Sequence, residues 1–170
     1  PAPNPPVGAV VVRGREIVGE GYHVAAGQPH AEAVALAAAG TRARGATLVV
    51  TLEPCAHHGR TPPCTEAIIA AGIAEVRHAI DDPDPRVSGR GARALGAAGV
   101  RVVAGERAEE AAELLRGYLA RQRTGRPWVS AKYAMSLDGK TATRTGDSRW
   151  ISGGASRAYV HTLRDRADAI

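Results

Sequence analysis

The sequence predicts a three-layer α/β domain with a partly parallel sheet, followed by the start of a second α/β domain. Three observations support this prediction. Short β-branched runs alternate with Ala-rich or amphipathic helical segments, as in domains built on parallel strands. Glycines stand where the helical segments end. The segment Thr124-Gly125-Arg126-Pro127 then separates a first domain, residues 1–123, from a second, residues 124–170.

The elements follow from local patterns. Two β-branched runs joined by a charged, Gly-containing turn predict an N-terminal hairpin, and a Pro-, Gly- and His-rich loop follows the next strand. In order, we expect strands at residues 7–12 and 17–21, a helix at 30–39 ending at Gly40, a strand at 47–52, a loop at 53–63, a helix at 65–71, a strand at 75–80, a helix at 91–98, a strand at 100–104, a helix at 109–121 and a strand at 128–134.

Both ends of the chain look cut from something longer. Pro1 is not an initiator residue, and the sequence stops inside an apolar stretch at Ala169-Ile170. We therefore expect one domain and a piece of another, with sequence missing at both ends.

The composition argues against several function classes. The formal charge of +5 comes from dispersed Arg residues without a block of five like charges, and four Tyr, two Trp and no Phe offer few platforms for stacking bases. No apolar run approaches the ~20 residues that span a bilayer, and no export signal is present. We expect a cytoplasmic protein with neither a nucleic-acid nor a membrane partner.

The two cysteines leave a disulfide, two free thiols or a metal site open. Pro29-His30-Ala31-Glu32, then Pro54-Cys55 and Cys64, match a zinc deaminase signature in residue type and order, with a longer gap between the cysteines. One His and two Cys leave the fourth position of a tetrahedral zinc open for water. We therefore predict zinc ligands His30, Cys55 and Cys64, with Glu32 as the proton shuttle.

Two other functions fit parts of this pattern. A different zinc-dependent nucleobase deaminase would use the same ligands and carboxylate. A non-catalytic, zinc-stabilised binding module would close the metal with a fourth protein ligand, for which His57 is placed two residues after Cys55.

The string Thr51-Leu52-Glu53-Pro54-Cys55-Ala56-His57-His58-Gly59-Arg60-Thr61-Pro62-Pro63-Cys64 closely resembles the bifunctional riboflavin-biosynthesis deaminase/reductase family. Further resemblance lies in residues 4–8, 82–91, 132–140 and 146–152. Membership implies a cytidine-deaminase-like domain that removes the ring amine of 2,5-diamino-6-ribosylamino-4(3H)-pyrimidinone 5′-phosphate. It also implies substrate contacts at Asn4, His23, His57 and Arg60. Family members carry a helix before the segment that matches residues 4–8, so the resemblance further implies that the first domain lacks its N-terminal helix.

The same resemblance implies that residues 124–170 begin a dihydrofolate-reductase-like domain. In this family such a domain uses NADPH to reduce the ribosyl chain of the deaminated product to a ribityl chain. Matching positions imply NADPH contacts at Ala134 and Trp150 and substrate contacts at Ser148 and Arg164. We expect a homo-oligomer whose reductase segment is too short to be active in this chain.

Overall fold

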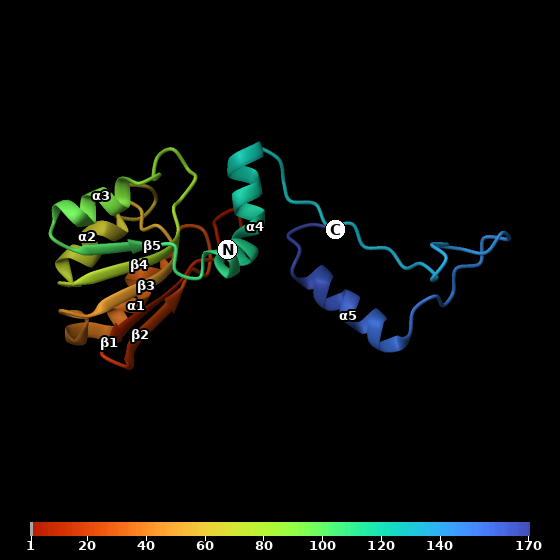
Figure 1. Cartoon of the computed structure of the whole chain (residues 1–170), viewed down its shortest axis with the longest axis horizontal. Coiled ribbons are helices and arrows are strands. Elements are labelled where there is room, and N and C mark those ends of the chain that lie inside the picture. The colour runs from red at the N-terminus through yellow and green to blue at the C-terminus, as the bar shows by residue number, and fades with distance from the viewer. Residues whose placement is uncertain (1) are drawn as a thin grey trace. The chain divides into compact units, whose positions relative to one another are not determined.

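The computed structural model describes residues 2–170 and divides into two compact units, which meet in the sequence between Trp128 and Val129. Figure 1 shows a β-sheet with helices in the first unit and one helix in the second. The elements are β1 (Gly8–Arg13), β2 (Glu16–Tyr22), α1 (Ala31–Ala39), a 3-10 helix (Gly40–Ala43), β3 (Thr47–Leu52), α2 (Cys64–Ala70), β4 (Glu75–Ile80), α3 (Arg90–Ala97), β5 (Arg101–Ala104), α4 (Ala108–Thr124) and α5 (Gly154–Asp165).

The sheet of the first unit has the strand order β2-β1-β3-β4-β5. β1 pairs antiparallel with β2 and with β3, whereas β3, β4 and β5 run parallel. The predicted hairpin and the partly parallel sheet are therefore confirmed. Because β3 and β4 are parallel, the loops that follow them leave the sheet at the same edge, where open α/β folds bind ligands.

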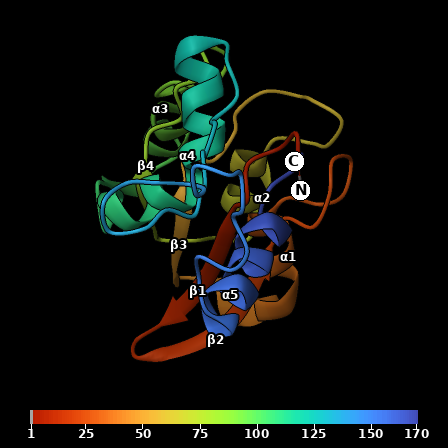
Figure 2. The same ribbon diagram turned by 90° about the vertical axis from the view of Figure 1, so that its right-hand side faces the viewer.

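One face of the sheet packs against α1, α2 and α3. The alternating side chains Val11, Leu48 and Val76 point to this face and are completely buried. Figure 2 shows α1 and α2 on the same side of the strands. The helices fill this core with Ala35, Leu36, Ile68 and Leu95. Each large buried aliphatic side chain contributes about 1.5–3 kcal/mol to folding, so this layer fixes where the helices begin.

Gly19 of β2 lies against the backbone of α1. A Cβ at this position would stand 2.3 Å from the Ala35 carbonyl oxygen and 2.6 Å from the Ala39 nitrogen. We expect Gly19→Ala to lower the free energy of unfolding by about 1–3 kcal/mol, because backbone has to move to relieve the overlap. Thermal unfolding measures this loss. Gly8→Ala is the matched control, since a Cβ at Gly8 meets nothing within 4 Å; equal losses in both variants would contradict the packing argument.

A second, smaller cluster places α4 at the carboxyl ends of β3 and β4. Leu115 and Leu119 of α4 are buried against Leu52, the last residue of β3. α4 therefore stands beside the loops that leave the sheet at this edge.

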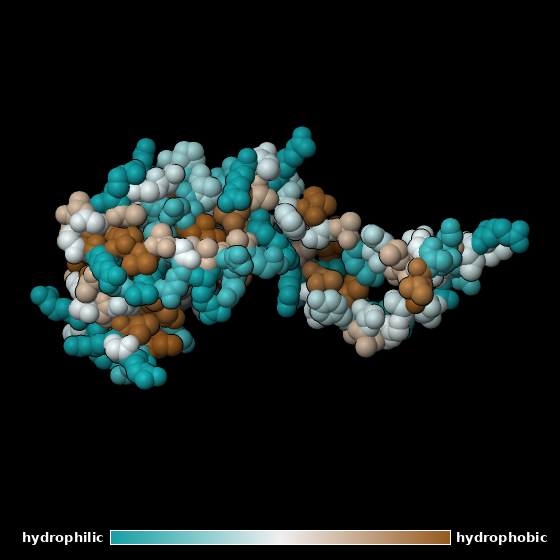
Figure 3. All heavy atoms as spheres, viewed as in Figure 1, coloured by the Kyte–Doolittle hydropathy of each residue, from teal (hydrophilic) through white to brown (hydrophobic). Residues whose placement is uncertain are grey.

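The second unit, residues 129–170, contains α5, a helix with no buried residue. Figure 3 shows apolar residues at the surface around α5. The expected strand at residues 128–134 is not formed: the chain is irregular there. A strand needs a neighbouring strand to pair its backbone groups, and residues 129–170 contain none. No helix formed by residues 2–170 is long and apolar enough to cross a membrane.

Candidate active site

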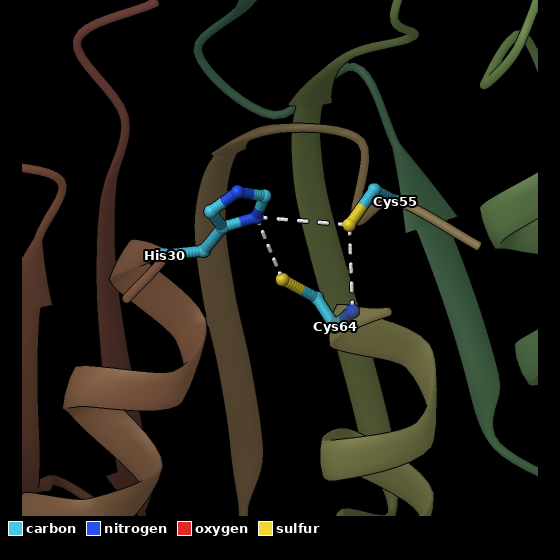
Figure 4. Close-up of side chains that lie close together, drawn as sticks. All are labelled: His30, Cys55 and Cys64. Atoms are coloured by element: carbon cyan, nitrogen blue, oxygen red, sulfur yellow. Dashed lines mark hydrogen bonds between the residues drawn. The ribbon is translucent and has the colours of Figure 1, made fainter. Parts of the chain in front are cut away.

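Three potential metal ligands meet at the carboxyl edge of the sheet. His30 directly precedes α1, Cys55 lies in the loop after β3, and Cys64 is the first residue of α2 (Figure 4). His30 Nδ1 lies 3.2 Å from Cys64 Sγ and 3.6 Å from Cys55 Sγ. The ligand atoms all lie within 4.8 Å of one another. Residues that stand 34 positions apart in the chain are thus brought to one point.

The geometry of this group fits zinc. A tetrahedral zinc with ordinary Zn–N and Zn–S bond lengths sets its ligand atoms about 3.5–3.8 Å apart, close to the two distances from His30 Nδ1. The His/Cys/Asp/Glu cluster found among residues 2–170 consists of His30, Cys55 and Cys64, and His57 is not in it. His57 is therefore not placed as the fourth zinc ligand that the binding-module alternative requires.

The two thiols differ in acidity. Interactions with the Cys64 side chain and with the His30 ring lower the pKa of Cys55 to about 4. The Cys64 backbone N–H also donates to Cys55 Sγ over 3.4 Å. The hydrogen bond with Cys55, followed by burial, raises the pKa of Cys64 above its ordinary value. The lowered pKa of Cys55 favours its thiolate, the form that binds zinc.

Thr61 holds the other side of the histidine ring. Its Oγ1 lies 3.2 Å from His30 Nε2. A proton on Nε2 that donates to this oxygen leaves the Nδ1 lone pair directed at the two sulfurs, as a metal ligand requires. The sequence motif contained Thr61, but no signal in it assigned the hydroxyl to the histidine.

We expect Thr61→Val to weaken zinc binding by about 10- to 100-fold, because loss of such a supporting hydrogen bond frees the ring to turn. Competition with a chromogenic chelator measures this affinity. Thr61→Ser keeps the hydroxyl and should bind zinc like the unaltered chain. If Thr61→Val does so as well, Thr61 does not orient His30.

Glu32 lies in the first turn of α1, and its side chain is buried beside the cluster. Burial raises the pKa of the Glu32 carboxyl above its ordinary value. The carboxyl also interacts with Cys64 by a hydrogen bond. A buried carboxyl beside a metal site is suited to take up and return a proton.

His23 and Asn4 form a hydrogen-bonded pair. His23 Nδ1 lies 3.1 Å from the Pro29 carbonyl oxygen, which can only accept, so Nδ1 carries the proton. His23 Nε2 then accepts from Asn4 Nδ2 over 2.9 Å. This arrangement leaves the Asn4 carbonyl oxygen available as an acceptor.

A cavity of about 560 Å³ opens over the cluster, within the usual size range of small-molecule sites. Seven of the eight residues predicted for the deaminase site line it: Asn4, His23, His30, Glu32, Cys55, His57 and Arg60. The eighth, Cys64, is buried. Thus the structure brings together residues that the sequence places in four separate segments.

The cavity has further walls that sequence reasoning missed. These are Thr61 and the residues Asp82, Asp84, Arg86, Tyr118, Arg121 and Gln122. The Tyr118 hydroxyl of α4 donates to Asp82 over 2.7 Å and fastens the helix to the loop after β4. Residues 82–91 belong to the family resemblance, but nothing in α4 beyond its amphipathic pattern indicates a cavity wall.

The residues predicted to contact NADPH and reductase substrate lie in the second unit. Ala134 lines an open hollow of about 620 Å³ with residues of α5. Ser148, Trp150 and Arg164 do not line it. Trp150 is 72% exposed, with the Arg157 guanidinium 4.2 Å over its ring, and Arg164 bonds to His161. These four contacts stay predictions.

Fold and site together are those of the zinc-binding cytidine deaminase class of proteins. Residues 1–80 match the model of the cytidine and deoxycytidylate deaminase zinc-binding region, and residues 127–170 match that of the RibD C-terminal domain. The chain belongs to the RibD family of riboflavin biosynthesis proteins.

Similarity to members of this family extends over nearly the whole chain. The riboflavin biosynthesis protein RibD of Escherichia coli is 53% identical over 168 residues, which are 99% of this chain and 46% of that protein. The structure of Acinetobacter baumannii RibD matches with a TM-score of 0.88 at 50% identity, over 96% of this chain and 46% of that one.

A third match is a structure from Thermotoga maritima, with a TM-score of 0.89 at 46% identity. That protein is described as a diaminohydroxyphosphoribosylaminopyrimidine deaminase/5-amino-6-(5-phosphoribosylamino)uracil reductase. This match covers 96% of this chain and 47% of that one. The chain thus spans slightly less than half the length of these relatives.

Proposed function

We propose that the first unit hydrolytically deaminates 2,5-diamino-6-ribosylamino-4(3H)-pyrimidinone 5′-phosphate. The observation that carries this proposal is a cluster of three zinc-type ligands with a buried glutamate beside it, at a cavity of about 560 Å³. Three protein ligands leave a coordination position for water, which distinguishes a catalytic from a structural zinc site. Similarity to the Thermotoga maritima structure, whose name describes a diaminohydroxyphosphoribosylaminopyrimidine deaminase, supports this substrate.

In this proposal His30, Cys55 and Cys64 hold zinc, which supplies Lewis-acid activation of a water molecule near neutral pH. Glu32 takes the proton of the attacking water and delivers it to the departing ring amine. The bond between the ring carbon and its exocyclic amine breaks, and ammonia leaves. The other proton of the water passes to the adjacent ring nitrogen, so that a ring carbonyl and a ring N–H remain. Asn4 and His23 orient the ring, with the Asn4 carbonyl oxygen as the acceptor that their hydrogen bond leaves available.

Recognition of the 5′-phosphate is assigned to Arg60, which lines the cavity in a loop and is mostly exposed. Arg suits this role because its planar guanidinium binds phosphate with two hydrogen bonds. Arg86, another arginine of the wall, is already paired with Asp84. His57 completes the pocket beside Arg60.

The proposal extends to the rest of the chain. Residues 1–123 are the deaminase domain, and residues 124–170 are the start of an NADPH-dependent reductase domain that reduces the ribosyl chain in the whole protein. The match of residues 127–170 to the RibD C-terminal domain supports this division. A cytoplasmic homo-oligomer acting on a small phosphorylated substrate belongs to the same proposal.

Ammonia release from the phosphorylated diaminopyrimidinone, measured beside zinc content, tests the function. We expect zinc-dependent release that stops on chelation and returns with zinc. Cytidine, adenine and an RNA are the comparison substrates: turnover of one of these in place of the phosphorylated pyrimidinone would make the chain a different nucleobase deaminase. Zinc without turnover of any substrate would support the binding-module alternative.

A further inference from the structure

The mechanism gives no role to the buried carboxylate of Glu53. Glu53 follows β3 and stands two residues before Cys55, and its side chain is only 3% exposed. A buried carboxylate is costly to keep unless hydrogen bonds replace its water. Glu53 meets this requirement with backbone donors alone: Asp82 N–H at 3.3 Å, Gly89 N–H at 2.9 Å and Ala92 N–H at 3.1 Å.

These donors belong to the loop between β4 and α3 and to the first turn of α3. The first N–H groups of a helix have no partner within the helix, and α3 has no capping side chain of its own. Glu53 supplies the missing acceptor from another part of the chain. Its negative charge also lies at the helix end that favours an anion.

The loop held in this way, residues 81–89, forms a wall of the cavity through Asp82, Asp84 and Arg86. The loop is ordered internally as well. Asp84 N–H donates to the Asp82 carboxylate at 2.9 Å, and the Asp84 carboxylate accepts from Arg86. The Glu53 carboxylate connects this internally hydrogen-bonded loop to the strand end that leads to Cys55.

The backbone confirms how closely the two segments lie. A Cβ at Gly91 would stand 1.9 Å from the Pro54 carbonyl oxygen. Only glycine allows α3 to begin directly against the Pro54 backbone. The first turn of α3 therefore touches the peptide unit that joins Glu53 to the metal-ligand segment.

We propose that Glu53 is a positioning residue that sets the distance between the zinc ligand Cys55 and the substrate-facing loop 81–89. Glu53 is not in the ligand cluster, and although it also lines the cavity, its carboxylate is held by the three backbone donors. The Glu53 carboxylate joins the strand end before Cys55 to the loop 81–89. A substrate ring at the zinc site therefore lies at a fixed distance from Asp82 and Asp84 of that loop. The kinetic part of this inference rests on the proposed function; the structural part does not.

The test compares Glu53→Gln with Glu75→Gln in the full 170-residue chain. Glutamine places an NH2 group among three donors and loses hydrogen bonds. Glu75 is the matched control because it is another largely buried strand-associated glutamate, but its partners are the side chains of Arg77 and Arg101. We expect Glu53→Gln to speed amide hydrogen exchange at Asp82, Gly89 and Ala92 by about 10- to 100-fold, and Glu75→Gln to leave these amides unchanged.

The kinetic readout is the split between KM and kcat at saturating zinc. We expect Glu53→Gln to raise KM for the phosphorylated pyrimidinone about 10-fold or more, with a smaller fall in kcat, because the displaced loop contacts substrate and not the proton path. Glu75→Gln should change neither. Unchanged exchange at the three amides, or changes equal to those of the control, would overturn the positioning role.

Two further outcomes are decided by the same measurements. If the unaltered chain shows no turnover, the proposed function fails while the exchange result still decides whether Glu53 holds the loop. If Glu53→Gln does not fold, exchange in the unaltered chain is decisive. Amides of Gly89 and Ala92 that exchange as slowly as those of β3 support the inference, and rapid exchange typical of an uncapped helix start refutes it.

Discussion

Glu32→Gln should lower the deamination rate by about 10²- to 10⁴-fold while leaving zinc bound at one ion per chain. Glutamine has nearly the same shape and fits the buried place of Glu32 in the first turn of α1. It cannot accept a proton from water and return it to the leaving amine. Because His30, Cys55 and Cys64 are untouched, the metal site persists without its proton carrier.

Ammonia release and zinc content, measured on the same sample, check this result. Glu66→Gln is the control, since Glu66 lies in the first turn of α2 but is exposed and paired with His58. That variant should turn over normally. Full activity in Glu32→Gln would show that another group carries the proton.

Cys64→Ser should have the largest effect on the metal itself. Only His30 and Cys55 would remain of the three clustered ligands. A structural zinc site with four ligands has an apparent binding energy of about 10–16 kcal/mol, so one ligand corresponds to roughly 10²- to 10³-fold in affinity. We expect the variant to lose zinc during dialysis against a mild chelator and to lose ammonia release with it.

Thr65→Val separates this loss from a packing effect. Thr65 is the next residue of α2 and is 4% exposed, so its substitution disturbs the same region without removing a ligand. That variant should retain zinc. If Cys64→Ser also retained it, the ligand assignment of Cys64 would be wrong.

The fold was predictable where local patterns and chain geometry agree. The hairpin, β3 and β4 follow from β-branched runs, and Gly40 closes the first helix as expected. The strand expected at residues 128–134 failed because an extended apolar pattern needs a pairing partner, which local sequence does not supply. Helix ends shifted by one to three residues, as they do when the last turn is decided by packing.

The ligand cluster was predictable because zinc chemistry demands particular residue types at helix starts and loop ends. The walls of the cavity were not. Thr61 acts through a hydroxyl that reaches the far side of His30, and Tyr118 reaches Asp82 from 36 positions along the chain. The first contact depends on the path of the loop at residues 53–63 and the second on how α4 packs over the sheet edge, and no local spacing encodes either.

Helix α4 both lines the cavity and leads on to the second unit. Its last turns line the cavity with Tyr118, Arg121 and Gln122, and the helix ends at Gly125, only a few residues before the second unit begins at Val129. A displacement of the last two turns of α4 would therefore move the cavity wall directly, and the Tyr118–Asp82 hydrogen bond opposes it. The end of α4, which leads on to the second unit, is thus also a wall of the cavity.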